Sequence, residues 1–280
     1  MESTFWLDAD ISALRTDMPI HFAHHRNPDT AENHRLHLNN HLEIYFFISG
    51  NHQYIVENAL YTLKPGDAIL ISPRQVHKAL PMDEGMYERF YFLLSDRALA
   101  GLQQDPLKSL LTRRGNLISF PEPVRQQVIH MLYGISECFQ NGRNDQLMAF
   151  GLFLSILAEL KNHAGRETAP QSRTAHTPEL LRRILTYVND HTASIQTTAE
   201  VATALGVSPQ YLSTYFSRHI GTPLKTYIQA KKIGLAKDLL SQGADVTRTC
   251  FDCGFNDCSY FIRIFKKYVG VTPLVYKQQG

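Results

Sequence analysis

Four histidines and one glutamate in the first third of the chain could bind a metal ion or a polar ligand: His34, His37, His41, Glu43 and His77. A metal site needs about three or four nitrogen, oxygen or sulfur ligands that converge in space. His41 and Glu43 would supply two of them from one face of a strand, because successive side chains of a strand alternate between its faces. The same groups could instead line a pocket for a small molecule.

The four cysteines are Cys138, Cys250, Cys253 and Cys258, too few and too clustered for a disulfide framework. The pair at Cys250 and Cys253 invites a zinc or redox interpretation. Without a fourth ligand such a zinc site is poor, so we expect these thiols to pack as small buried hydrophobic groups. Cys258 differs, because a thiol at a helix N-terminus has a lowered pKa and is oxidisable.

Catalysis is not indicated by any motif in the sequence. We find no serine-histidine-acid set, no phosphate-binding glycine loop and no dinucleotide fingerprint. We therefore expect no catalytic residues, no bound metal and no cofactor.

The composition indicates a folded protein. The chain has 280 residues, of which 44% are hydrophobic, and a formal net charge of +2, so it can bury enough apolar surface to offset its ordering entropy. No run of apolar residues approaches the roughly 18 that a membrane span requires. The first residues also lack the basic and apolar segments of a secretion signal. We expect a cytoplasmic protein.

The charge is divided unevenly about a polar, linker-like run between residues 164 and 177. From Gln171 onward the chain has 13 basic and 7 acidic residues, and before it 15 basic and 19 acidic residues. A basic C-terminal part favours a polyanionic partner, whereas the acidic N-terminal part must do something else.

Short strands are expected in the N-terminal part. Leu42 to Tyr54 is rich in β-branched and aromatic residues and is broken at Gly50-Asn51, which predicts a hairpin. Similar segments follow at residues 61–63, 68–72 and 87–94. Short strands at such spacing predict an antiparallel β-barrel or jelly roll, a fold that can hold a small ligand.

Two helices are expected after the strands, from Pro123 to Phe139 and from Asp145 to Leu160. The second is apolar around most of its circumference. One of its faces would cover the barrel and another would meet a partner, which makes a dimer interface plausible. It could equally be packed between its own barrel and the neighbouring helix.

The N-terminal part resembles the cupin fold. His37, Glu43 and Gly50 match the first cupin motif, although Asn39 replaces its second histidine. The segment from Pro65 to His77 resembles the second cupin motif at Pro65-Gly66-Asp67, Pro73 and His77. Because one metal ligand is missing, we favour a pocket for a sugar-like or other small ligand, lined by His41, Glu43, Tyr45 and His77.

The C-terminal part is predicted to be helical, with capping residues and glycines that mark where the helices begin and end. A helix is expected from Pro178 to about Val188. Thr197 and Glu200 have capping-box spacing at the start of a short helix that stops at Gly206, and Ser208-Pro209 caps the next helix. This is a helix-turn-helix. The plan recurs downstream, with Gly254 in the place of Gly206, after a long helix from Leu224 to Leu240.

These residues resemble the AraC/XylS family of bacterial transcription regulators. Gly254 to Pro273 looks like the family signature, and Ala202 to Pro223 fits its first unit. Lys232, Thr249 and Cys250 depart from the usual residues.

The resemblance implies an α+β two-domain fold. A cupin-like antiparallel β-barrel or jelly roll with two C-terminal helices would precede an all-α domain of two helix-turn-helix units joined by a long helix. The expected parts are a ligand-sensing and dimerisation domain (1–163), a linker (164–176) and a DNA-binding domain (177–280) with units at about 197–223 and 245–273.

A recognition helix reads base edges near its N-terminus, while flanking basic side chains neutralise phosphates. In the first unit we expect base contacts from Ser208, Gln210, Tyr211, Ser213 and Thr214, with Arg218 nearer the backbone. In the second, Asn256, Asp257, Cys258, Ser259 and Arg263 face the DNA, and Lys266 and Lys267 face phosphates.

We therefore expect a ligand-responsive, sequence-specific DNA-binding regulator. The resemblance implies double-stranded promoter DNA, a small effector such as a carbohydrate, a homodimer formed through the N-terminal domain, RNA polymerase if the protein is an activator, and association with the nucleoid. One alternative is a metal-dependent cupin enzyme, such as an oxidase or isomerase, fused to a DNA-binding domain. Another is an architectural DNA binder with a vestigial barrel.

Overall fold

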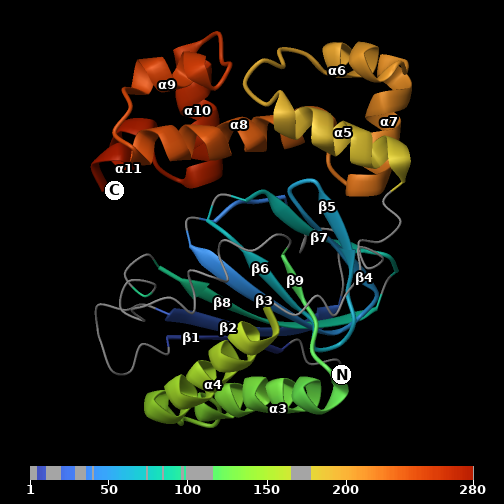
Figure 1. Ribbon diagram of the computed structural model, residues 1–280. Helices are drawn as coiled ribbons and strands as arrows, with labels where there is room; N and C mark the ends of the chain where they lie inside the picture. Colours follow the sequence, from blue (N-terminus) through green and yellow to red (C-terminus); the bar gives the residue numbers. More distant parts are fainter. Residues whose placement is uncertain are drawn as a thin grey trace.

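The structure, a computed structural model, describes residues 5–10, 20–28, 36–39, 41–73, 75–83, 85–95, 98, 116–164 and 178–279. These residues form four layers: two helices, a large sheet, a small sheet and a helical domain (Figure 1). His34, Thr177 and nearly all of the expected linker lie outside the described residues. The expected α+β fold, with an antiparallel sheet domain followed by helix-turn-helix units, is confirmed.

The two sheets of the N-terminal domain pair their strands antiparallel. In the described part of the chain the large sheet has the order β1-β2-β8-β3-β6-β9 and the small sheet the order β5-β4-β7. The strands are β1 (Phe5–Asp10), β2 (Ile20–Pro28), β3 (Leu42–Ser49), β4 (His52–Val56), β5 (Ala59–Thr62), β6 (Ala68–Ile71), β7 (His77–Pro81), β8 (Met86–Leu94) and β9 (Leu117–Ile118).

The expected hairpin at Gly50-Asn51 is wrong. β3 pairs with β6 and β8 in the large sheet, whereas β4 pairs with β5 and β7 in the small one. Gly50 has a φ of 120°, a conformation that glycine adopts readily, and the chain passes there from one sheet to the other. A strand-turn-strand pattern does not distinguish such a corner from a hairpin.

The large sheet is buried on both faces. Successive side chains of a strand point to opposite faces, and here each face packs against a different core. Ile44, Phe46, Phe90 and Phe92 belong to a core formed with the two helices that cover the outer face. Tyr45 and Phe47, one position further along β3, belong to a second core between the sheets. We call this region between the two sheets the sheet interior.

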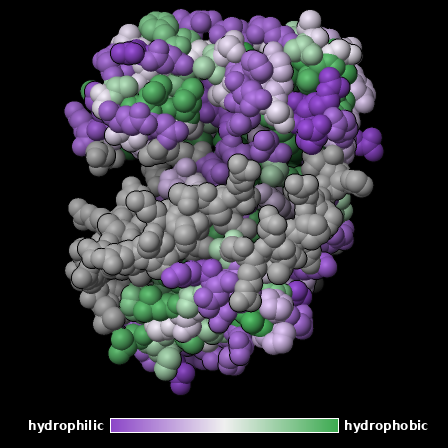
Figure 2. All heavy atoms as spheres, viewed as in Figure 1, coloured by the Kyte–Doolittle hydropathy of each residue, from purple (hydrophilic) through white to green (hydrophobic). Residues whose placement is uncertain are grey.

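The two covering helices are α3 (Glu122–Cys138) and α4 (Gln146–Ala164). α4 buries Phe153, Ile156 and Leu160 against the sheet. Its other face leaves Leu147, Met148 and Leu154 exposed, at 64%, 56% and 41% of their surface. Figure 2 shows apolar side chains gathered over these helices, at the lower end of the molecule. Among the described residues, no helix has the length and apolar character that crossing a membrane requires.

The C-terminal domain consists of short helices around one long central helix. In chain order they are α5 (Glu179–Asp190), α6 (Thr198–Leu205), α7 (Pro209–Ile220), α8 (Leu224–Ser241), α9 (Val246–Asp252), α10 (Cys258–Val269) and α11 (Pro273–Gln279). α8 is buried on several sides, since both helix-turn-helix units pack against it. The expected long connecting helix is thereby confirmed.

The small sheet packs directly on the C-terminal domain. Ile55, Leu60, Val76 and Leu80 belong to the same buried core as the residues of α5 to α10. His77 and Ala79 of β7 are also buried, and Ala79 belongs to the core between the two sheets. Because neighbours on a strand alternate between its faces, β7 connects the sheet interior with the helices of the C-terminal domain.

Candidate functional site

The sheet interior holds a cluster of polar and aromatic side chains. Tyr45 of β3 and Tyr87 of β8 share a hydrogen bond between their hydroxyl groups. Arg89 Nη1 donates to the Tyr87 hydroxyl oxygen at 3.4 Å. The His52 ring stacks on Tyr87 with 4.0 Å between centroids. Glu43 Oε2 lies 3.2 Å from His77 Nε2.

The Glu43 carboxyl is ionised in this interior. Burial alone would raise its pKa, but the hydrogen bond to His77 and the charges of His77, His37 and Arg89 outweigh burial, so the pKa lies below its ordinary value. Burial raises the pKa of Tyr45 well above its ordinary value, and this phenol stays neutral. A carboxylate and a guanidinium therefore share a space lined by neutral hydroxyl groups.

Three of the four side chains expected to bind a ligand lie in this interior. Glu43, Tyr45 and His77 are buried, at 5%, 1% and 0% exposure. His41 is exposed, because it lies in the bend before β3 begins and strand alternation does not extend to it. Sequence reasoning missed Tyr87 and Arg89. Their alternation with Phe90 and Phe92 on β8 is the signal that could have indicated them.

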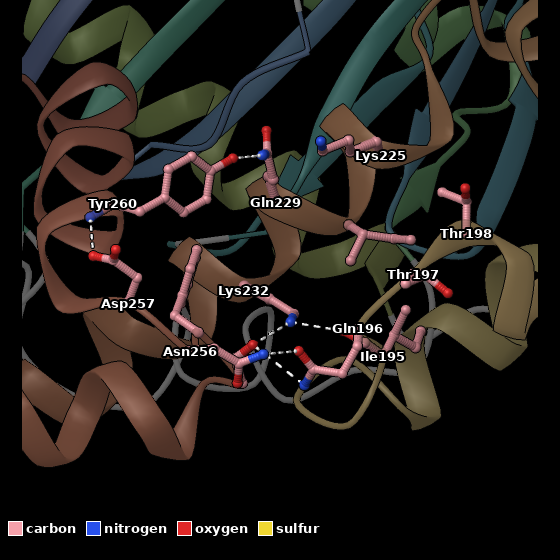
Figure 3. A pocket seen from close by; sticks show the side chains of 13 residues that line it. Ile195, Gln196, Thr197, Thr198, Lys225, Gln229, Lys232, Asn256, Asp257 and Tyr260 are labelled. Carbon is pink, nitrogen blue, oxygen red and sulfur yellow. Dashed lines mark hydrogen bonds between the residues drawn. The ribbon is translucent and has the colours of Figure 1, made fainter.

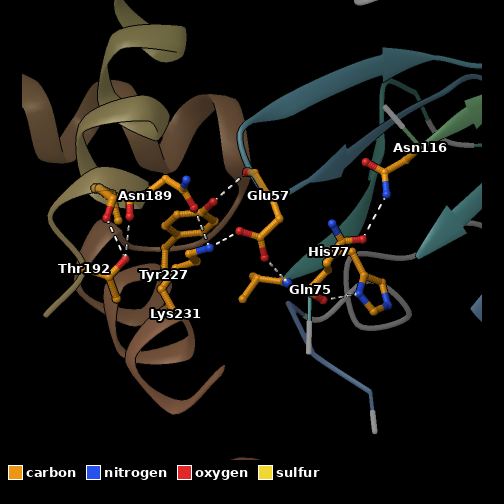
Figure 4. Close-up of polar contacts among 10 residues, drawn as sticks. Glu57, Gln75, His77, Asn116, Asn189, Thr192, Tyr227 and Lys231 are labelled. Atoms are coloured by element: carbon orange, nitrogen blue, oxygen red, sulfur yellow. Dashed lines mark hydrogen bonds and ion pairs between the residues drawn. The ribbon is translucent and has the colours of Figure 1, made fainter. Parts of the chain in front are cut away.

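Polar contacts across the boundary between the domains hold the small sheet on the C-terminal domain. The Tyr227 hydroxyl donates to the Glu57 carbonyl oxygen at 2.6 Å, and Lys231 of α8 forms an ion pair with the Glu57 carboxylate (Figure 4). Lys78 Nζ donates to the carbonyl oxygens of Ile220 and Gly221, each at 3.0 Å. The end of α7 and the middle of α8 are thus fixed to the sheet.

The first helix-turn-helix unit is formed by α6 and α7. Thr197 Oγ1 accepts from the Glu200 backbone N–H at 3.3 Å, and Ser208 Oγ accepts from that of Tyr211 at 3.2 Å. These caps confirm the expected helix starts. Gly206 ends α6 with a φ of 71°. This left-handed residue turns the chain into α7.

The second unit repeats this geometry with α9 and α10. Asp257 Oδ1 accepts from the Tyr260 backbone N–H at 2.8 Å and caps α10. Gly254 has a φ of 74°, close to that of Gly206. Asn256 Nδ2 donates to Gln196 Oε1 at 2.9 Å. The two units are therefore in direct contact.

A cleft of about 420 Å³ lies beside this contact, between the start of the first unit, α8 and the second unit (Figure 3). At its base Lys232 Nζ donates to the carbonyl oxygens of Ile195, at 2.7 Å, and Gly254, at 2.6 Å. The ammonium group also lies 5.5 Å from the centroid of the Phe255 ring. Lys232, one of the departures from the usual family residues, thus joins the first unit to the second.

The structure places nearly all side chains expected to contact DNA on the surface. The exposed ones are Ser208, Gln210, Tyr211, Ser213, Thr214, Arg218, Asn256, Asp257, Ser259, Arg263, Lys266 and Lys267, while Cys258 is half-buried. Ser208 and Asp257 act as helix caps, and Asn256 contacts Gln196. Arg263 lies over the Tyr260 ring at 5.3 Å from its centroid.

The cysteines of the second unit pack in the core. Cys250 and Cys253 are fully buried, and burial raises the pKa of each thiol to about 12. Such thiols are protonated at neutral pH. Their expected packing as hydrophobic groups is confirmed. Cys258 is the first residue of α10, as expected.

The fold and these surfaces define a DNA-binding protein with a separate ligand-binding domain. Residues 19–157 match the AraC-like ligand binding domain, and residues 201–279 match a helix-turn-helix domain. The chain belongs to the AraC/XylS family of transcription regulators. It is accordingly a regulator and not an enzyme, as expected.

Two relatives align over most of the chain. The HTH-type transcriptional regulator YbfI of Bacillus subtilis is 26% identical over 255 residues, which is 88% of either chain. The arabinose operon regulatory protein of Salmonella typhimurium is 27% identical over 76% of this chain and 75% of its own. Among solved structures, ToxT of Vibrio cholerae covers 92% of this chain and 98% of its own at 15% identity, with a TM-score of 0.39.

Proposed function

We propose that this regulator binds a specific promoter site and responds to a small polar metabolite, with a carbohydrate as the first candidate. The observation that carries the proposal is the sheet interior, where Glu43, Arg89, Tyr45 and Tyr87 converge. A few placed polar groups among aromatic walls are typical of sites for small ligands. The name of the relative from Salmonella, which refers to the arabinose operon, agrees with a sugar.

The route from effector to DNA is the β7 strand. His77 contacts Glu43 in the interior, and the next residue, Lys78, holds the end of α7. An effector that binds one arrangement of the domains better than another shifts the population between them. A tenfold change in DNA affinity requires about 1.4 kcal/mol of such coupling.

The DNA-contacting surface consists, in this proposal, of the exposed residues of the two recognition helices. Gln210, Tyr211, Ser213 and Thr214 of α7 and Ser259 and Arg263 of α10 read bases, with Ser208, Asn256, Asp257 and Cys258 at the helix starts. Arg218, Lys266 and Lys267 neutralise phosphates. In this proposal the sensing domain spans residues 1–163, the linker 164–176 and the DNA-binding domain 177–280.

Replacing Arg263 with alanine is expected to weaken specific DNA binding about 5-fold to 150-fold. An arginine that bonds a guanine edge contributes about 1–3 kcal/mol of discrimination, and each 1.4 kcal/mol is about tenfold in affinity. Binding is measured by titration of promoter DNA. The matched control is Arg143→Ala, since Arg143 is exposed but belongs to the N-terminal domain. Equal losses of DNA affinity in the two variants would show that Arg263 does not read a base.

The same titration tests the function as a whole. The full-length protein is titrated on DNA upstream of its own gene and its neighbours, and on scrambled DNA, at several salt concentrations and with a panel of sugars. Tight binding to one site, with a steep salt dependence and a response to one sugar, is the expected result. Equal binding to every DNA would contradict sequence specificity. Specific binding whose affinity no sugar changes would contradict the proposal that the effector is a carbohydrate.

We also propose that the protein is a homodimer through α4, acting in the cytoplasm on the nucleoid and contacting RNA polymerase if it is an activator. The support is the exposed apolar face of α4, because exposed apolar patches mark interaction sites. Met148→Glu is expected to shift the full-length protein from dimer to monomer in sedimentation velocity. The control is Gln140→Glu, on the loop that follows α3. A wild-type monomer at micromolar concentration would contradict the proposal.

A further inference from the structure

Arg89 brings a positive charge into the sheet interior. It lies opposite Phe47 of β3 in the large sheet, and directly paired residues share a face. Its guanidinium lies over the rings of Tyr87 and Tyr91, 5.2 Å and 5.9 Å from their centroids. On its other side Arg89 pairs with His25 of β2. Burial, followed by the charge of Arg89, lowers the pKa of His25 to about 3, so this imidazole is neutral and the guanidinium supplies the positive charge.

The guanidinium uses few of its hydrogen-bond donors. An arginine side chain has five N–H groups, but within the described residues that of Arg89 makes one hydrogen bond, from Nη1 to the Tyr87 hydroxyl oxygen at 3.4 Å. Its Nε is buried and has no partner among the same residues. Buried donors without partners are costly, and buried charges are normally paired. Because Arg89 as a whole remains partly accessible, a ligand can approach it.

Glu43, the carboxylate of the candidate site, is engaged by other neighbours. Its Oε2 lies 3.2 Å from His77 Nε2 and accepts a hydrogen bond from Asn39 Nδ2 at 2.5 Å. Burial raises the pKa of Glu43, and among the groups that lower this pKa, His77 and His37 act more strongly than Arg89. In the part of the chain that the structure describes, Arg89 forms no ion pair with a carboxylate. Its charge is therefore available for a ligand.

Neutral phenol groups surround this charge. Burial raises the pKa of Tyr45, Tyr54 and Tyr91, and in each case the charge of Arg89 acts in the opposite direction, as expected of a neighbour. The hydroxyl groups keep their protons and can donate hydrogen bonds. A guanidinium with phenol donors beside it suits an anionic group, whose oxygens accept every hydrogen bond. A neutral hydroxyl group of a ligand would leave the charge uncompensated.

The balance of charges favours a carboxylate over a phosphate. A guanidinium binds either group through two parallel hydrogen bonds. One guanidinium balances one negative charge, whereas a phosphate monoester carries about −1.5 to −2 at neutral pH. The ionised Glu43 in the same interior would repel the excess charge of a phosphate.

We propose that Arg89 pairs with a carboxylate group of the effector, so that this regulator senses a sugar acid and discriminates against the neutral sugar. The inference rests on the proposed function, because it names the chemical class of the effector for the same site. Pairing with the carboxylate satisfies donors of Arg89 that the protein leaves unused. The hydroxyl groups of the sugar acid are left for the phenols.

Thermal unfolding of the full-length protein without DNA tests this inference. D-galacturonate is compared with D-galactose and D-galactose 6-phosphate at equal ionic strength, D-glucuronate and D-gluconate with D-glucose and D-glucose 6-phosphate. A ligand that binds the folded state raises the midpoint of unfolding. We expect one of the three acids to do so at a concentration about tenfold or more below that required of its neutral sugar or phosphate.

Arg89→Met is expected to weaken binding of that acid about 10-fold to 150-fold, because it removes a charged hydrogen-bond donor. Binding of the neutral sugar should hardly change. Without ligand, the variant should unfold at the same or a higher temperature, since an unpaired buried charge is costly. Arg89→Lys keeps the charge without the planar fork and should show an intermediate loss. The matched control is Arg143→Met, at an exposed position of the loop between α3 and α4, which should bind as the wild type does.

The outcomes separate this inference from the proposed function. Equal effects of acid and neutral sugar, a stronger effect of the phosphate, or no effect of any acid would overturn the assignment to Arg89. So would an acid that binds Arg89→Met as tightly as the wild type. A specific DNA site that responds to a neutral sugar would keep the proposed function and remove only this inference. Equal binding to every DNA would remove the proposed function, although binding of the acid would still be measurable.

Discussion

Replacing Gly254 with alanine is expected to destabilise the C-terminal domain by about 2–5 kcal/mol. A Cβ at this position would lie 1.8 Å from the Ala193 carbonyl oxygen, so the turn between α9 and α10 must move away from the segment between α5 and α6. Overpacking that forces backbone shifts costs about 1–3 kcal/mol, and a left-handed backbone adds about 1–2 kcal/mol for alanine. The free energy of unfolding is measured by urea denaturation of the full-length protein, followed by circular dichroism.

Gly206→Ala is the matched control for this prediction. Gly206 has nearly the same backbone conformation, but a Cβ there would meet no atom within 4 Å. It should therefore show only the backbone contribution of about 1–2 kcal/mol. Similar losses in the two variants would show that the close approach of Gly254 to Ala193 does not limit stability.

Replacing Lys78 with methionine is expected to release the N-terminal domain from the DNA-binding helices. The substitution keeps the aliphatic length but removes the hydrogen bonds to the Ile220 and Gly221 carbonyls and to Thr222 Oγ1. These carbonyls end α7, where a positive charge is also favourable. Losing a charged hydrogen-bond donor costs about 1.5–3 kcal/mol.

We expect amide hydrogen exchange in β7 and at the end of α7 to accelerate about 10-fold to 100-fold in this variant, while the sheet core near Phe92 keeps its protection. A loss of about 1.4 kcal/mol corresponds to each factor of ten. The control is Lys64→Met, at an exposed position of the same domain. Unchanged exchange in the Lys78 variant would mean that the other contacts across the boundary, including those of Glu57 with Tyr227 and Lys231, hold the domains together without Lys78.

The C-terminal domain was the more predictable part of the fold. Its boundaries depend on local chemistry, such as the caps at Thr197 and Ser208 and the left-handed glycines at Gly206 and Gly254, and local chemistry is visible in sequence. Sheet partners are not local. The corner at Gly50 looks like a hairpin because strand pairing is decided by residues far along the chain.

The residues of the candidate ligand site were predictable only in part for the same reason. Glu43, Tyr45 and His77 carry recognisable side chains, but Tyr87 and Arg89 join them only because β8 pairs with β3. Lys78 and Lys232 could not be assigned either. Their partners are backbone carbonyls in other helices and turns, and a carbonyl has no signature in the sequence.

The small sheet is covered on both faces, and this limits how the N-terminal domain can be exchanged between such regulators. Its inner residues belong to the core between the sheets, where the proposed ligand site lies, whereas its outer residues Ile55, Leu60 and Leu80 share a core with the DNA-binding helices. A chimaera that exchanges the first domain for that of a relative would therefore carry a foreign outer face onto α7 and α8. Transplanting a new sensor onto this DNA-binding domain requires grafting the outward residues of β4, β5 and β7 together with it.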